Sequence, residues 1–125
     1  MGLCEWRDHH GVPYLYTSYA ISDPAQARAV GDRQFELIMA EPAGSLVRLL
    51  VDARGGLAGG WDRDHLKRAR DQGKVSSGHV RLRIAVLGVS GLLVPLIRGM
   101  SAIGGGMTLV PCPTEDKAFG FLMRD

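Results

Sequence analysis

Two short apolar runs dominate the hydrophobic pattern of the chain, and each predicts a strand that is covered on both faces. The first run is Leu46–Asp52 and the second is Ile84–Leu87. Neither run alternates strictly between apolar and polar residues, which is typical of strands in a parallel sheet. The segments around them carry apolar residues at three- and four-residue spacing, which predicts helices.

This spacing predicts helices over residues 22–40, 61–72, 90–103 and 114–123. Serine or threonine lies at the start of three of them, where its oxygen can accept a hydrogen bond from an unpaired backbone N–H group. Residues 73–78 contain two glycines and two serines, and we expect a loop there.

The first twenty residues predict a β-hairpin. Residues 3–7 alternate, residues 8–11 have the composition of a turn, and residues 12–20 are rich in Val, Tyr and Thr. Near the other end of the chain, residues 107–110 predict a short strand that Pro111–Pro113 should end.

The predicted order is therefore a hairpin followed by alternating helices and strands. This order predicts an α/β fold in which a mixed, mostly parallel sheet of about five strands is opened by the hairpin and covered by about four helices. With 125 residues, we expect a single domain over 1–125.

Composition narrows the class of protein. The net charge of +2 is too small to indicate nucleic-acid binding. No apolar run reaches the ~18 residues that span a bilayer. Residues 1–8 lack the order of a signal peptide, so we expect a cytoplasmic protein in which Cys4 and Cys112 are reduced.

Three segments carry a resemblance to a known family. They are the strand end Leu49–Asp52 with its glycine-rich loop, the segment Ile84–Leu92, and the closing segment Pro113–Leu122. With the predicted order of elements, they resemble the STAS domain, and most closely the uncharacterised bacterial proteins grouped as STAS/SEC14-like, or SpoIIAA-like. The chain departs from this pattern at Cys112, where an aromatic residue is usual, and at Gly120–Phe121, where Trp is common.

The resemblance implies a protein-interaction module similar to the anti-sigma factor antagonists. Those proteins are phosphorylated on a Ser or Thr in the loop that follows the Asp-bearing strand. Here the corresponding region is Gly55–Asp62, which contains no hydroxyl group. We therefore expect the phosphorylation switch to be absent and the interaction surface to be kept.

Candidate catalytic residues do not form a recognisable set. Gly88–Gly91 is similar to a nucleophile elbow, but residue 92 is not the glycine that the motif needs, and both His65 and His79 precede Ser90. Ser90 is better explained as a helix cap. The pair His9–His10 is better explained as a solvated turn than as a metal site. We expect no enzymatic activity, no cofactor and no metal.

Two surfaces are candidates for binding. The expected partner surface combines Trp61 and the glycine-rich loop before it with a basic stripe at helical spacing, formed by Arg63, Lys67, Arg70 and Lys74. Arg81 and Arg83 could extend this stripe. The expected ligand surface lies where open α/β sheets bind ligands, at the carboxyl ends of the strands: Asp52, Arg54, Gly55, Ser90 and Gly91.

The leading hypothesis is a regulatory or scaffolding module that binds another protein. The alternative is a small-molecule or lipid-binding protein of the SEC14-like type, with an apolar pocket near Leu92 and Leu96. An enzyme that acts at the corner of Asp52, Arg54 and Ser90 is a third hypothesis. The sequence also leaves open a homodimer through an edge strand or a helix.

Overall fold

The chain folds around one five-stranded sheet with strand order β1-β2-β3-β4-β5. The structure is a computed structural model that describes residues 3–18, 24–54, 63–88 and 107–124. The elements in chain order are β1 (Leu3–His9), β2 (Val12–Ser18), α1 (Pro24–Met39), β3 (Leu46–Asp52), α2 (Arg63–His79), β4 (Arg81–Leu87), β5 (Met107–Cys112) and α4 (Glu115–Leu122).

The predicted hairpin is confirmed, with a tighter turn than expected. β1 and β2 are antiparallel, and β1 continues to His9, so that the connection is only His10 and Gly11. Both residues have positive φ, at 51° and 85°. A two-residue turn with positive φ at both residues matches the right-handed twist of the two strands that it joins. The Gly11 N–H donates to Asp8 Oδ2 at 2.9 Å, which holds the turn closed.

The other strand pairs are parallel, so the predicted mixed and mostly parallel sheet is confirmed. The register aligns the carboxyl ends of four neighbouring strands. Ser18 of β2 lies opposite Asp52 of β3, which lies opposite Leu87 of β4, and Leu87 lies opposite Cys112 of β5. Side chains at this edge of the sheet are therefore brought together from segments far apart in the sequence.

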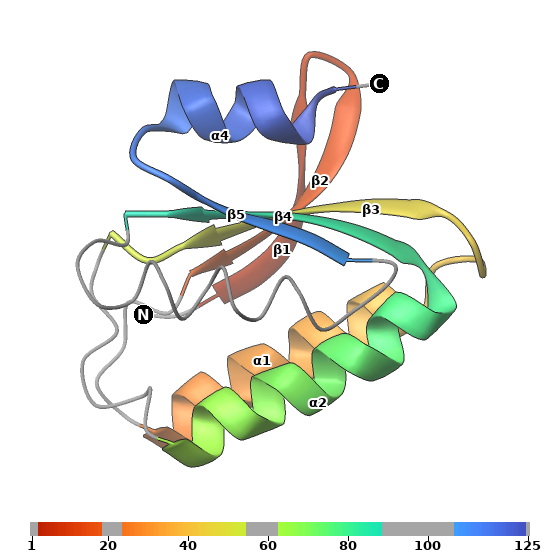
Figure 1. The fold of residues 1–125 in the computed structure, drawn as a ribbon, viewed down its shortest axis with the longest axis vertical. Helices are drawn as coiled ribbons and strands as arrows, with labels where there is room; N and C mark the ends of the chain where they lie inside the picture. Colours follow the sequence, from red (N-terminus) through yellow and green to blue (C-terminus); the bar gives the residue numbers. More distant parts are fainter. Residues whose placement is uncertain (1–2, 19–23, 55–62, 89–106, 125) are drawn as a thin grey trace.

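Helices cover both faces of the sheet (Figure 1). The face that carries α1 and α2, the helix-pair face, is built from aliphatic side chains such as Leu15, Leu49 and Ile84. Of the three described helices, α4 lies on the opposite face, with Leu50, Leu87 and Leu122 in the core beneath it. The sheet is covered on both sides, as its continuous apolar runs predicted.

Helix α2 is longer than predicted, and the expected loop over residues 73–78 is wrong. The helix continues to His79. Ser76 is only 2% exposed, and its carbonyl accepts from the N–H of the buried Val80 at 2.9 Å. Gly73 faces the thioether of Met107 from β5, where a Cβ would lie 3.6 Å from the sulfur. Packing against the sheet thus outweighs the weak helix propensity of glycine and serine.

Strand β5 also extends further than predicted, because Pro111 does not end it. Pro111 pairs with Val86, and the strand runs to Cys112. β5 is at the edge of the sheet, where a residue without an N–H group is tolerated. The predicted helix over 90–103 lies outside the described residues, which contain three helices.

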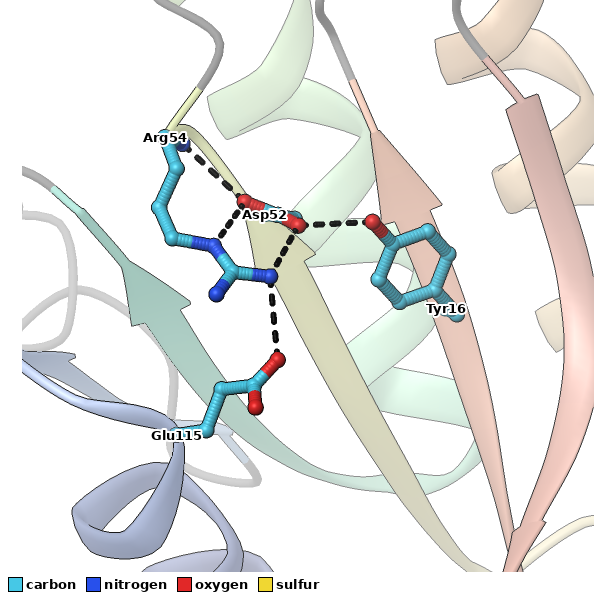
Figure 2. A network of polar contacts seen from close by, with 4 residues as sticks. All are labelled: Tyr16, Asp52, Arg54 and Glu115. Atoms are coloured by element: carbon cyan, nitrogen blue, oxygen red, sulfur yellow. Dashed lines mark hydrogen bonds and ion pairs between the residues drawn. The ribbon is translucent and has the colours of Figure 1, made fainter.

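The start of α4 is as predicted. Thr114 is the N-cap, and its hydroxyl oxygen accepts a hydrogen bond from the Lys117 N–H at 3.3 Å. Glu115 and Asp116 lie in the first turn, where carboxylates are favoured by the helix dipole. Ala118 and Leu122 are fully buried against the sheet. This cap places Glu115 close to the carboxyl end of β3 (Figure 2).

Candidate functional site

Asp52 is the central residue of the polar network at the carboxyl end of the sheet. It is the last residue of β3, and only 7% of its surface is exposed. The Tyr16 hydroxyl, which comes from the neighbouring strand β2, donates to Asp52 Oδ2 at 2.6 Å (Figure 2). A buried carboxylate requires such partners, because an unpaired buried charge is costly.

Arg54 supplies the remaining contacts of Asp52. Its backbone N–H donates to Asp52 Oδ1 at 3.0 Å, its Nε to Oδ1 at 3.1 Å and its Nη2 to Oδ2 at 2.9 Å. The same Nη2 lies 3.0 Å from Glu115 Oε1 of α4 (Figure 2). Arg54 therefore connects the end of β3 to the start of α4, while half of its side chain stays exposed.

These contacts keep Asp52 ionised. Burial alone would raise its pKa, but the hydrogen bonds from Arg54 and Tyr16 outweigh burial and lower the pKa from 3.8 to about 2. Burial and the hydrogen bond to Asp52 both raise the pKa of Tyr16. The Asp52 carboxylate is a weak base with both oxygens engaged, so it is poorly suited to accept a proton from a substrate.

Gly88, which follows β4, allows Arg54 to take this position. Its φ is +89°, a conformation that other residues rarely adopt. A Cβ at Gly88 would lie 2.9 Å from both the Cα and the backbone nitrogen of Arg54. The Gly88 N–H donates to the Cys112 carbonyl at 3.3 Å, and the Ala53 N–H donates to the Leu87 carbonyl at 2.7 Å. At the carboxyl end of the sheet, the polar network of Asp52 therefore lies on closely packed backbone segments. We call this region the Asp52 corner.

The network continues onto the hairpin. The Arg7 guanidinium of β1 lies over the Tyr16 ring, with its central carbon 3.7 Å from the ring centre. Arg7 Nε also lies 2.9 Å from Glu5 Oε2. Such a stacked cation gains from the ring's electron density. A chain of polar contacts therefore runs from Glu5 and Arg7 through Tyr16 to Asp52.

The expected ligand surface is only partly within the described structure. Asp52 and Arg54 lie together as predicted, but they bind each other. Gly55, Ser90 and Gly91 lie outside the described residues, as do Leu92 and Leu96 of the expected pocket.

The expected partner surface is described on α2. Lys67 and Arg70 are exposed there, together with Lys74. Trp61 lies outside the described residues, and so does the side chain of Arg63.

The predicted extension of the basic stripe to Arg83 is wrong. Arg83 Nη1 donates to the Leu122 carbonyl at 3.1 Å and also to the Arg124 carbonyl, so it lies beneath α4 on the face opposite to α2. Arg81 is two residues earlier in the same strand. Alternation along β4 therefore places it on that same face.

Tyr16 and Glu115 are members of the site that sequence reasoning missed. In the sequence, Tyr16 belongs to the predicted hairpin and Glu115 to the predicted helix over 114–123, and neither position by itself indicates a place beside Asp52. The pairing of β2 with β3 contained the missing signal. Tyr16 lies two positions before Ser18, the residue opposite Asp52, and therefore on the same face of the sheet as Asp52.

The histidine pair also differs from expectation. His9 belongs to β1 rather than to a solvated turn, and its ring stacks on Phe119 of α4 at a centroid distance of 4.1 Å. Within the described ranges, no three His, Cys, Asp or Glu side chains are grouped so that they could hold a metal ion. Cys4 and Cys112 are buried and unbridged, and burial raises the pKa of both thiols. None of the helices described is both long and apolar enough to cross a membrane.

A solved structure shares this fold. The crystal structure of an uncharacterized protein from the DUF3478 family with a SpoIIAA-like fold, from Shewanella loihica PV-4, superposes with a TM-score of 0.74. The match covers 98% of this chain and 95% of that chain, at 13% sequence identity. No protein-family model matches the chain, and no curated protein matches it. The resemblance inferred from the sequence is confirmed for the fold: the chain is an α/β domain with a SpoIIAA-like fold.

Proposed function

We propose that this protein is a non-catalytic regulatory or scaffolding module that binds another protein. The observation that carries the proposal is the state of Asp52. At the sheet edge where α/β proteins place their ligands, this carboxylate is already engaged by Tyr16 and Arg54. The corner holds β3, β2 and α4 together, which is a structural role rather than a chemical one.

The outer face of α2 supports a protein partner. Lys67, Arg70 and Lys74 are exposed at spacings of three and four residues, so they lie on one side of the helix. No described acidic residue pairs with any of the three, whereas Arg68 is bound by Asp32 of α1 at 2.6 Å. A partner with an acidic surface would complement this face.

The composition of residues 55–62, which precede α2 in the sequence, distinguishes this chain from the phosphorylated anti-sigma factor antagonists that it resembles. Residues 55–62 contain no Ser, Thr or Tyr. In those proteins, a phosphate on the corresponding segment adds about two negative charges and changes the interface. In this protein, the concentration of the partner, rather than phosphorylation of residues 55–62, would control whether the two proteins bind.

The test is affinity capture with quantitative mass spectrometry. The bait is the full chain, compared with the double variant Lys67→Glu/Arg70→Glu and with the control Lys117→Glu, which reverses an exposed charge on α4. We expect the wild type and the control to retain the same partner, and the double variant to lose it at least about tenfold, because two attractive contacts become repulsive.

Equal capture by the double variant would exclude the α2 face, and failure of the wild type to retain any specific protein would contradict the module itself. Native mass spectrometry of gently purified protein provides the second measurement. A bound small molecule that is lost on denaturation would favour the ligand-binding alternative over the interaction module.

A further inference from the structure

β1 is an edge strand of the sheet, and its outer side carries backbone N–H and C=O groups that β2 does not pair. In antiparallel pairs, hydrogen-bonded and non-hydrogen-bonded positions alternate. Asp8 lies opposite Pro13, which has no N–H to donate, so Asp8 occupies a non-hydrogen-bonded position. Trp6 and Cys4 lie two and four residues before Asp8, so they also occupy non-hydrogen-bonded positions. The backbone N–H and C=O groups of all three residues therefore point away from β2.

A side-chain contact confirms this orientation. Arg33 of α1 donates from Nε to the Cys4 carbonyl at 2.9 Å, so this carbonyl is not used in the ladder with β2. The carbonyl oxygen has two lone pairs and can accept a second bond. The backbone N–H and C=O groups of Trp6 and Asp8 form no hydrogen bond to another segment within the described part of the chain.

The side chains of β1 are complementary to those of a second, inverted β1. Glu5 and Arg7 lie on the face of α4, with half or less of each side chain exposed, and Trp6 lies on the opposite face with 38% of its surface exposed. Trp6 is one of the two large apolar side chains that the described residues leave exposed. A strand with one acidic and one basic residue placed symmetrically about a tryptophan is suited to pair with itself.

We propose that β1 pairs antiparallel with β1 of a second copy of this chain, about a two-fold axis at Trp6. The backbone N–H and C=O of Trp6 then exchange hydrogen bonds with Trp6 of the second copy, and the two indoles meet. Glu5 of each copy lies opposite Arg7 of the other, at the closer type of cross-strand position. The sheets of the two copies become continuous.

Only this register pairs the outward-pointing backbone groups and also places opposite charges across from each other. An axis at Glu5 or at Arg7 would place like charges opposite each other, and the backbone groups of these two residues point toward β2 rather than outward. An axis at Cys4 or Asp8 would leave the Glu5–Arg7 contacts unmade. The pairing also leaves Lys67 and Arg70 of α2 unused, so the dimer does not depend on the proposed partner surface.

The test is the oligomeric state of charge variants, measured by sedimentation equilibrium and native mass spectrometry. Wild type should form a two-chain species. Glu5→Arg and Arg7→Glu should each raise the dimer dissociation constant at least about tenfold, because both cross-strand contacts become repulsive. An equimolar mixture of the two variants should restore dimers that contain one chain of each, and the double variant Glu5→Arg/Arg7→Glu should dimerise with itself.

The control is Arg124→Glu, an exposed charge two residues beyond the end of α4, which should dimerise as the wild type does. Circular dichroism verifies that each variant folds. Hydrogen exchange on wild-type protein gives a measurement independent of any variant: the amides of Trp6 and Asp8 should become protected as concentration rises. A wild type that stays monomeric throughout the micromolar range, or variants that do not complement each other, would overturn the proposal.

Discussion

The two faces of the sheet are closed by different means. On the helix-pair face, α1 and α2 cover a core of aliphatic side chains and Cys4. On the other face, α4 is a single helix of eight residues that packs on β3, β4 and β5 (Figure 1). Beyond the strands that α4 contacts, the described residues of this face include the charged side chains of Glu5 and Arg7 on β1.

The charged contacts that hold α4 to the sheet fall at both ends of that helix. Arg54 binds Glu115 at its start. At its end, Arg48 Nε and Arg83 Nη1 both donate to the Leu122 carbonyl, at 2.8 and 3.1 Å. Carbonyls in the last turn of a helix lack partners within the helix, so cations here are stabilising. The helix-pair face is therefore held mainly by apolar burial, whereas the α4 face adds ion pairs and charged hydrogen bonds to its apolar core. The two faces should respond differently to pH.

The largest expected effect is on the helix-pair face. Leu49 is 1% exposed, and Leu49→Ala should lower the free energy of unfolding by about 3 kcal/mol because it leaves a cavity in a packed core. The loss should be the same at pH 7 and pH 3, since no titrating group is involved. Urea unfolding at both pH values measures it, with the exposed Val75→Ala as the control. If the loss of unfolding free energy in Leu49→Ala disappeared at pH 3, the core of the helix-pair face would depend on a titrating group, contrary to expectation.

A smaller effect, dependent on pH, is expected for Asp52→Asn on the α4 face. The folded-state pKa of about 2 lies below the ordinary 3.8, so the ionised carboxylate contributes stability above pH 4 that is lost as pH falls through about 2. The difference between the two pKa values corresponds to about 2 kcal/mol. The variant should therefore be less stable by about this amount at pH 7 and should approach the wild type near pH 2. Urea unfolding across this range measures the change, and a constant difference at every pH would argue against an ionised Asp52.

The smallest effect is expected at the end of α4. Arg48→Met or Arg83→Met alone should cost about 1 kcal/mol or less, because the other arginine still binds the Leu122 carbonyl. The double variant should cost more than the sum of the two, since it leaves the carbonyl without either cation. Urea unfolding and hydrogen exchange across α4 measure this coupling, and Arg124→Met is the control. Strictly additive losses would show that the two arginines act separately.

The sheet could be predicted from the sequence because its strands are apolar runs that few other structures could bury. The parallel pairing of β3 with β4 follows from Leu46–Asp52 and Ile84–Leu87 alone. The end of α2 could not be predicted, because its Gly73 and Ser76 favour helix only when packed against β5 and β4. The same holds for Pro111, which continues a strand because that strand lies at an edge.

Two of the four residues of the candidate site, Asp52 and Arg54, could be predicted from the sequence. Asp52 ends a buried strand and Arg54 follows it, at the edge where α/β proteins carry polar groups, so the sequence places them together. Their mutual ion pair could not be predicted, because it needs the left-handed Gly88 to clear space for Arg54. Tyr16 and Glu115 reach the site through strand register and the α4 cap, and neither can be read from local sequence alone.

The most direct test of this account is the pKa of Asp52, measured by following its side-chain carboxyl carbon by NMR as pH is lowered. If Tyr16 and Arg54 keep this carboxylate ionised and occupied, its role is structural. We then expect a pKa of about 2. A pKa at or above the ordinary 3.8 would show that the carboxylate is not held in this way, and would reopen an acid–base role for the carboxyl end of the sheet.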